Sequence, residues 1–386
     1  MKIIAFYLPQ FHEIPENDRW WGKGFTEWEN VKKAKPLFSG HKQPRIPLGD
    51  NYYNLLDDKT KIWQCDLAKK YGIYGFCFYH YWFNGKLLLE KPAEQYLKNP
   101  RCDLPFCFSW ANEYWTNGWI SANSKILIYH DNRDPKDWEA HFLYWLPFFR
   151  DPRYIKIEGK PLLILYFPDI LQKYDEMIKC WRKMAKTYGF PDIYILYQKA
   201  ATHFNPKIEK KYFDGGIEFQ PGYDELSRKT KAQLRKERLI FNCSNWAKKT
   251  FKISFIHKHD GELKHENYDE TWRRIIGHKP DDSSMYPGAF VDWDNTPRKG
   301  RRGSVFDGVT PEKFQNYLAE QIVNSRENYH KDILFLFAWN EWGEGGYLEP
   351  TIQDGFSYLQ ALKNALEETG EFTNIPSDSV GLSRNF

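Results

Sequence analysis

Cysteine pairs, long apolar runs and an excess of charge of one sign are all missing from this sequence. Its six cysteines include no Cys-x-x-Cys pair, and three lie in apolar stretches typical of a core. No apolar run approaches the roughly 20 residues that a membrane span needs. The 55 lysines and arginines against 51 acidic residues leave a net charge of only +4. We therefore expect a reducing compartment, no membrane span and no nucleic-acid partner.

The N-terminus lacks the features of a secretory leader. Its first apolar run, residues 3–8, is too short for the apolar region of a signal peptide, and no small-residue cleavage site follows it. We expect a cytoplasmic protein, or a periplasmic one if a leader has been removed. No glycine-rich phosphate loop follows this run, and no cofactor is predicted.

One cluster of histidines has the spacing of a metal site. His257, Lys258 and His259 form an HxH pattern, with Asp260 and His265 close behind. On an extended segment the two imidazoles would share a face and could hold one zinc ion. The cluster lies in a basic stretch away from the predicted strand ends, and no HExxH accompanies it. We interpret these side chains as solvated loop histidines and predict no metal.

Aromatic residues are abundant, at 18% of the chain with 16 Trp, 25 Tyr and 28 Phe. Sugars bind proteins largely by laying their C–H faces on aromatic rings, so this excess favours a carbohydrate partner. Core packing is the alternative explanation, and it accounts for most of the rings.

Eight apolar stretches, mostly separated by helical segments, predict eight parallel strands with helices outside. Eight is the number of strands that closes into a barrel, so the predicted fold class is α/β, a (β/α)8 TIM barrel with long loop insertions. We expect one barrel domain over 1–386, with a long aromatic loop at 9–56, a basic insertion at about 221–284 and a polar tail from about 370. The predicted strands are 3–8, 73–79, 105–109, 161–166, 193–198, 216–220, 286–291 and 333–338, and the main predicted helices are 59–71, 134–150, 169–188, 311–328 and 355–368.

Two glutamates follow the last of these strands directly. Glu341 and Glu344 are three residues apart, between the indoles of Trp339 and Trp342 and several glycines. Two neighbouring carboxyls cannot both ionise cheaply, so one tends to keep its proton while the other acts as a base, as glycosidic bond cleavage requires. A polar loop with solvent-facing glutamates is the alternative. The flanking indoles and the strand end favour a catalytic pair.

Polar or aromatic residues follow the other predicted strands as well, and catalytic residues of barrels collect at these ends. We predict as substrate-binding residues His80, Trp110, Asn112, Glu113, Asp292, Asp294, Trp339, Asn340 and Trp342. The alternative for His80 and Asn112 is a structural hydrogen bond, and for Trp110 it is packing. A polar residue after an apolar strand is also the ordinary start of any loop.

Several blocks, in order, resemble the WbsX-type proteins of bacterial polysaccharide gene clusters. They are AFYLPQFH (5–12), WGKGFTEW (21–28), YHYWF (79–83), FSWANE (108–113) and DWDNTP (292–297), and the resemblance extends to about residue 350. Those proteins are usually described as glycosyltransferases, yet they are similar to the family 99 glycoside hydrolases, the endo-α-mannosidases and endomannanases, which are (β/α)8 barrels.

The NEWGEG block at 340–345 resembles the family 99 catalytic motif, and the resemblance implies a role for each glutamate. Glu341 would take the proton of the substrate's 2-hydroxyl, whose oxygen attacks the anomeric carbon to form an epoxide-like intermediate. Glu344 would be the general acid and then the base for water, so that the anomeric configuration is retained. Gly343 stands where those hydrolases tend to have a larger residue, and their mannose-subsite loops are not recognisable here.

Two other functions stay open. A glycosyltransferase of surface polysaccharide (O-antigen or capsule) biosynthesis is the first alternative, because Asp292 and Asp294 form a DxD, a pattern that holds a divalent ion against a nucleotide diphosphate. DxD arises often by chance, which weakens this argument. The second alternative is a non-catalytic carbohydrate-binding barrel, against which the two glutamates argue. The sugar, the linkage, endo or exo action and the oligomeric state stay open.

Overall fold

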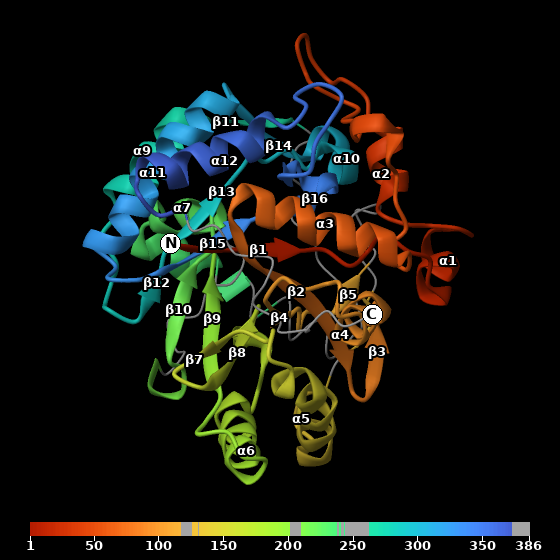
Figure 1. Ribbon diagram of the computed structural model, residues 1–386, viewed down its shortest axis with the longest axis vertical. Helices are drawn as coiled ribbons and strands as arrows, with labels where there is room; N and C mark the ends of the chain where they lie inside the picture. The colour runs from red at the N-terminus through yellow and green to blue at the C-terminus, as the bar shows by residue number, and fades with distance from the viewer. Residues whose placement is uncertain are drawn as a thin grey trace, which may run out of the picture.

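The computed structural model describes residues 1–116, 126–129, 131–200, 210–237, 239–240, 243 and 262–372. Within them, nine parallel strands form the main sheet, in the order β12-β10-β9-β8-β4-β2-β1-β15-β13 (Figure 1). Their bounds are β1 Lys2–Tyr7, β2 Ile73–Phe83, β4 Phe106–Trp110, β8 Lys160–Leu165, β9 Tyr194–Lys199, β10 Gly215–Glu218, β12 Met285–Tyr286, β13 Gly288–Phe290 and β15 Ile333–Phe337.

The sheet closes on itself at Pro287, which has no N–H and interrupts the predicted strand 286–291. Before it, β12 pairs with β10, and after it, β13 pairs with β15. The two ends of the sheet are therefore halves of one continuous segment, and the predicted eight-strand barrel is confirmed. A Cβ atom on Gly288 would lie 2.0 Å from the carbonyl oxygen of Glu218, so the chain can cross here only with glycine.

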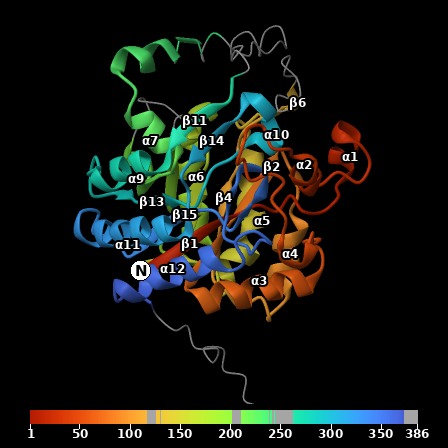
Figure 2. The same cartoon turned by 90° about the horizontal axis from the view of Figure 1, so that it is seen from above.

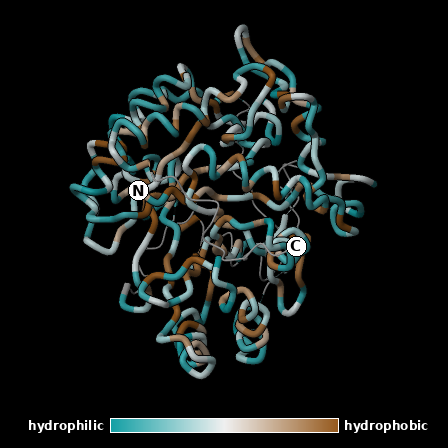
Figure 3. The backbone as a smooth tube through the Cα atoms, viewed as in Figure 1, coloured by the Kyte–Doolittle hydropathy of each residue, from teal (hydrophilic) through white to brown (hydrophobic). Residues whose placement is uncertain are grey.

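The barrel interior is filled with aromatic rings. The ring centroids of Phe6 and Phe219 are 5.1 Å apart, and those of Phe219 and Phe337 are 5.5 Å apart. All five residues of β15 are buried, as expected for a strand with no solvent-facing side. Hydrophobic segments accordingly run through the middle of the molecule (Figure 3). Much of the aromatic excess therefore belongs to the core.

Helices cover the outside of the barrel, and a capping side chain marks the start of several of them. Asp57 accepts a hydrogen bond from Lys59 N at the start of α3, and Gly72 ends that helix with a φ of 91°. Among the predicted helices, the largest difference in a boundary is at α6, which begins at Tyr174 and not at residue 169. The chain before it forms a 3-10 turn, after which Leu171 is buried. The outer helices are α3 Asp58–Tyr71, α4 Lys91–Lys98, α5 Pro135–Arg150, α6 Tyr174–Thr187, α9 Tyr268–Gly277, α11 Pro311–Glu327 and α12 Ser357–Glu368.

The stretch 221–284 contributes to the barrel wall as well as to its rim. In α9, Trp272 is fully buried and stacks on Phe290 with ring centroids 5.3 Å apart. The strand β11 (Lys264–Asn267) pairs in parallel with β14 (Ser304–Asp307). In the view of Figure 2 this pair and α10 (Thr296–Lys299) lie on the side of the molecule opposite to α3 and α12.

Short elements make up the rest of the described chain. They are α1 Pro15–Trp21, α2 Trp28–Lys33, η1 Leu48–Asp50, β3 Lys86–Leu88, β5 Trp115–Thr116, β6 Ile126–Ile128, β7 Lys156–Ile157, η2 Pro168–Ile170, η3 Lys210–Tyr212, α7 Gly222–Ser227, η4 Gly300–Arg302, β16 Asn340–Glu341, η5 Trp342–Glu344 and β17 Gly346–Tyr347. None of the helices in the described residues is both long and apolar enough to cross a membrane.

Candidate active site

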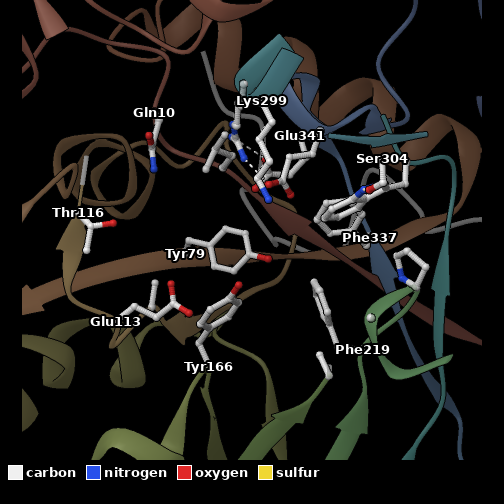
Figure 4. A pocket seen from close by; sticks show the side chains of 18 of the residues that line it. Gln10, Tyr79, Glu113, Thr116, Tyr166, Phe219, Lys299, Ser304, Phe337 and Glu341 are labelled. Atoms are coloured by element: carbon white, nitrogen blue, oxygen red, sulfur yellow. Dashed lines mark hydrogen bonds and ion pairs between the residues drawn. The ribbon is translucent and has the colours of Figure 1, made fainter. Parts of the chain in front are cut away.

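A pocket of about 410 Å³ opens at the carboxyl ends of the barrel strands. Successive strands, or the loops that follow them, each supply part of its lining (Figure 4). In strand order these residues include Leu8, Gln10, Tyr79, Tyr81, Glu113, Tyr166, Ala200, Phe219, Trp293, Phe337, Glu341 and Glu344. This is the end of a (β/α)8 barrel at which active sites lie.

A tight hairpin after β15 carries both glutamates into the pocket. Glu341 ends β16, which pairs antiparallel with β17, and Glu344 ends the single turn η5 between them. Gly345 closes the turn with a φ of 72°, and a Cβ atom there would lie 2.7 Å from Asp294 N. Asp294 N in turn donates a hydrogen bond to Glu344 O at 2.7 Å. The backbone of Glu344 is therefore tied to the segment that follows β13.

Arg298, from α10, joins the two glutamates. Its Nη2 lies 3.1 Å from Glu341 Oε2, and its Nη1 lies 2.7 Å from Glu344 Oε1. Its Nε donates to a third carboxylate, Glu27, at 2.6 Å. Because two nitrogens of one guanidinium reach them, Glu341 and Glu344 lie within the span of a single planar group. The structure therefore brings the two carboxyls of this predicted pair to the same arginine.

The two glutamates differ in their surroundings. The Glu341 side chain is 5% exposed and that of Glu344 is 22% exposed. Burial raises the pKa of Glu341 to about 8, and the charges of Glu344 and Glu27 add to this, while Arg298 opposes it. This raised pKa favours the protonated form of Glu341 near neutral pH and leaves a fraction of it ionised.

Tyrosines from β2 and the loop after β8 face the same space. Tyr79 and Tyr166 stand near each other beside Glu113 and Glu341 (Figure 4). Burial raises the pKa of both phenols well above the usual range, so both stay neutral. Gln10 Nε2 donates to the hydroxyl of the third tyrosine, Tyr81, at 3.0 Å. These hydroxyls can hydrogen-bond a polar ligand, and the rings offer apolar faces.

Among the predicted substrate-binding residues, Glu113 lines this pocket and the other eight do not. His80 points outward to α5, where its Nε2 lies 2.8 Å from His141 Nε2, and burial lowers the pKa of His80 to about 3. Side chains alternate along a strand, so His80 faces away from the side that Tyr79 and Tyr81 line. Trp110 is buried against Trp181, with ring centroids 5.9 Å apart.

Two predicted amide side chains bind backbone groups instead. Asn112 donates to Phe167 O at 2.6 Å and accepts from Phe167 N at 2.7 Å. Asn340 makes the same pair of bonds with Leu8. In both cases the side chain ties one strand-end loop to another. The structural alternative for Asn112 is therefore the observed arrangement.

The two predicted indoles that flank Glu341 are also buried, and neither lines the pocket. Trp339 is fully buried and packs on Phe76, with ring centroids 5.1 Å apart. Trp342 donates its Nε1–H to Glu349 Oε2 at 2.7 Å. Glu349 also accepts from Tyr53 OH, and burial raises its pKa to about 7. These contacts support the glutamate hairpin from beneath.

Both aspartates of the DxD lie outside the main pocket and already have protein partners. Asp292 Oδ2 accepts from Arg45 at 2.7 Å, while Asp294 Oδ2 accepts from Gln43 at 2.7 Å and lies 2.9 Å from His41 Nε2. They line a separate cavity of about 160 Å³. Val305 and Asp307 of β14 line this second cavity together with the two aspartates.

The residues that the structure describes contain no group of three or more His, Cys, Asp or Glu side chains suited to a metal ion. Of the predicted histidine cluster, His257, His259 and Asp260 lie outside the described residues. His265 is described, and its Nδ1 lies 2.9 Å from Asp307 Oδ2 on the neighbouring strand.

Glu27, Arg298, Tyr79 and Tyr166 belong to the site but were not predicted as site residues. Glu27 and Tyr79 lie in the WGKGFTEW and YHYWF motifs, and Arg298 directly follows the DWDNTP motif, so their position in or beside a motif was the available signal. For Tyr79, alternation along β2 was a second signal. No local pattern distinguishes a buried arginine such as Arg298 from a solvated one.

The fold and the site define a (β/α)8 barrel with a pair of glutamates in its strand-end pocket. The chain belongs to the family described as Glycosyltransferase WbsX, whose model matches residues 3–362. The resemblance inferred from the motifs is thereby confirmed.

Two curated relatives are similar to this chain in sequence, and two solved structures are similar to it in fold. Uncharacterized proteins WxcX from two strains of Xanthomonas campestris pv. campestris, B100 and ATCC 33913, are each 34% identical over 98% of this chain and 51% of their own length. The chain thus spans about half of these relatives. A GH99 endo-α-mannosidase from Bacteroides thetaiotaomicron is similar in fold, with a TM-score of 0.53 and 14% identity over 96% of this chain and 97% of that one. A glycoside hydrolase-like protein gives a TM-score of 0.53 with 12% identity over 94% and 93%.

Proposed function

We propose that this chain is a retaining glycoside hydrolase that cleaves a bacterial polysaccharide or a related glycan, with Glu341 and Glu344 as its catalytic pair. The observation that carries the proposal is the convergence of both carboxyls on Arg298 in a strand-end pocket. The GH99 endo-α-mannosidase fold of the similar structures supports the reaction class. The aromatic lining supports a sugar ligand, since Tyr79, Trp293 and Phe337 present rings to the pocket.

In the proposed first step, the Glu341 carboxylate accepts the proton of the substrate's 2-hydroxyl. The 2-oxygen attacks the anomeric carbon, the bond from that carbon to the leaving oxygen breaks, and Glu344 donates a proton to the leaving oxygen. In the second step Glu344 accepts a proton from water, whose oxygen attacks the anomeric carbon and opens the epoxide. Glu341 then returns its proton to the 2-oxygen. Two inversions at the anomeric carbon retain its configuration.

The difference between the two glutamates supports this assignment of roles. A 2-hydroxyl is a weak acid, so it needs the stronger base of the pair. Burial raises the pKa of Glu341 to about 8, which makes its carboxylate more basic than an ordinary one while leaving a fraction ionised near neutral pH. The more exposed Glu344 is the one that water can approach.

Incubation with a panel of bacterial surface polysaccharides tests the proposal, with products identified by mass and the first-formed anomer by NMR. Glu344→Gln should lower the release of reducing ends by about 10²–10⁴-fold, the usual contribution of acid–base catalysis, while the substrate still binds. Glu312→Gln, on the exposed surface of α11, is the matched control. Unchanged turnover in Glu344→Gln would remove Glu344 from the mechanism.

Two further measurements, made beside this incubation, separate the hydrolase from the two alternative functions. The family description names a glycosyltransferase, for which a nucleotide sugar with a divalent ion should raise the melting temperature and no polysaccharide should be cleaved. A binding barrel should retain a glycan on an affinity matrix without forming any product. Either result would overturn the proposal that this chain is a glycoside hydrolase.

A further inference from the structure

Glu27 is a fully buried carboxylate that the proposed chemistry does not use. It directly precedes α2, in the WGKGFTEW block, and its side chain is 0% exposed. Its Oε1 accepts from Arg298 Nε at 2.6 Å and, more weakly, from Asn30 Nδ2 at 3.4 Å. None of the described residues donates a hydrogen bond to its Oε2. A buried carboxylate is costly unless it is paired, so Arg298 is the group that makes Glu27 tolerable here.

Binding at one edge of a guanidinium determines where its other nitrogens point. The group is planar and its donors form a rigid fork. With Nε held by Glu27, Nη1 reaches Glu344 at 2.7 Å and Nη2 reaches Glu341 at 3.1 Å. The Arg298 side chain is itself only 7% exposed, so solvent does little to set its orientation.

Gly343 provides the space for this arrangement. A Cβ atom at this position would lie 2.0 Å from Glu27 Oε1 and 2.7 Å from Arg298 Nε. Both distances are far below van der Waals contact, so any larger residue between the two catalytic glutamates would displace the pair.

We propose that Glu27 is a positioning residue of this active site, which holds Arg298 between Glu341 and Glu344 and thereby sets the charge that the two glutamates share. Gly343 is the residue that leaves room for it. The effect of Glu27 on catalysis rests on the proposed function. Its contact with Arg298 and its effect on the charge of Glu341 do not.

The groups around Glu341 explain how Glu27 acts on it. Arg298 comes from α10, Glu344 from η5 and Glu27 from the residue before α2. The phenols of Tyr79 and Tyr81 face Glu341 from β2, and that of Tyr166 faces it from the loop after β8. Three carboxyls thus share one guanidinium, and a retained proton relieves the surplus negative charge. Burial is the largest cause of the raised pKa of Glu341, and Glu27 adds to it. Neutralising Glu27 should therefore lower the pKa of Glu341.

Carboxyl NMR of the full chain, labelled with ¹³C in its glutamate side chains, tests this without any substrate. The Glu341 resonance is assigned from the spectrum of Glu341→Gln. In Glu27→Gln the amide oxygen can still accept from Arg298 Nε, but the negative charge is lost. The midpoint of the Glu341 titration should therefore fall by about 1 pKa unit, the lower end of the range for one nearby charge. Glu29→Gln, on the same helix and paired with Lys33, is the matched control and should leave it unchanged. A folded Glu27→Gln protein with the wild-type midpoint would overturn the proposal.

Gly343→Ala keeps the test decisive if Glu27→Gln does not fold. Its methyl group should push both Glu27 and Arg298 away from this position. The charge of Arg298 affects the pKa of Glu341 more than the charge of Glu27 does, so the weaker contact with Arg298 should dominate and raise the Glu341 midpoint. Gly277→Ala, where a Cβ atom would meet nothing within 4 Å, is the control. An unchanged midpoint in Gly343→Ala would overturn the proposal as well.

The two proposals fail in different ways. If no glycan is cleaved but the Glu341 midpoint shifts as expected, the hydrolase is wrong and the role of Glu27 in setting the charge stands. If glycans are cleaved, a positioning role predicts that Glu27→Gln lowers kcat more than it raises KM and moves the pH profile by the NMR shift. If glycans are cleaved but Glu27→Gln does not move the pH profile, the positioning role of Glu27 is wrong and the hydrolase proposal stands.

Discussion

Asn340 and Leu8 are joined by two hydrogen bonds where β1 ends and the glutamate hairpin begins. Leu8 N donates to Asn340 Oδ1 at 2.7 Å, and Asn340 Nδ2 donates to Leu8 O at 3.1 Å. Both residues are buried. The backbone register between β1 and β15 ends at Ala5 and Leu336, so the amide side chain continues the link beyond it. The residue before Glu341 is thus attached to the barrel wall.

Asn340→Ala should weaken both the fold and the reaction. It leaves the Leu8 N–H and C=O unpaired in a buried position, which should cost about 1–3 kcal/mol of unfolding free energy. Because Glu341 is the next residue, kcat should fall more than KM rises. Urea unfolding and steady-state kinetics measure the two effects. A variant as stable as wild type would show that the bonds contribute no net stability.

The pH dependence of kcat/KM should show a limb that rises with a midpoint at about 8, the raised pKa of Glu341. As the proposed base, Glu341 must be ionised, so activity should increase as pH rises through this value. A profile measured from pH 5 to 10 tests the sign. Activity that falls above pH 8 would instead make Glu341 the proton donor and reverse the two roles.

Glu341→Gln should gain stability relative to wild type as pH rises. The pKa of Glu341 is about 8 in the folded chain against an ordinary value near 4.5, so between these values the folded state holds a proton that the unfolded state has released. Wild-type stability therefore falls over this window, and the glutamine variant lacks this loss. Each pKa unit corresponds to roughly 1.4 kcal/mol, which gives a total on the order of a few kcal/mol. Urea unfolding at pH 5 and pH 9 measures it, and an equal difference at both pH values would contradict it.

His80→Ala should be a stability variant and not a binding variant. The side chain lies between β2 and α5, where it faces His141 at 2.8 Å, and does not line the pocket. Its loss leaves a cavity and removes the contact with His141, with an expected cost of about 2–4 kcal/mol. KM for a cleaved glycan should stay within about twofold of wild type. A large rise in KM with little loss of stability would return His80 to the predicted role of sugar contact.

The barrel was predictable because parallel strands buried on both faces appear in a sequence as continuous apolar runs. The predicted strands 3–8, 73–79 and 333–338 each became a strand of the barrel. The interruption at Pro287 was less visible, since each half of that segment pairs with a different neighbour.

The site was predictable only in part. Glu341, Glu344 and Glu113 line the pocket as expected, whereas His80, Trp110 and the two DxD aspartates lie elsewhere. A strand end indicates that a residue is near the pocket, but the side toward which it points depends on the strand's rotation in the closed barrel.

The sequence by itself determined the strands, the capped helices and the place of the glutamate pair at a strand end, because periodicity and capping act over a few neighbouring residues. Only the tertiary structure decided which side chains those glutamates contact. Arg298 is 43 residues from Glu341 and 271 from Glu27, and closure of the barrel brings the three together. A charged loop residue looks the same in a sequence whether it is solvated or buried, and the energy of such a pairing depends on burial that no local pattern records.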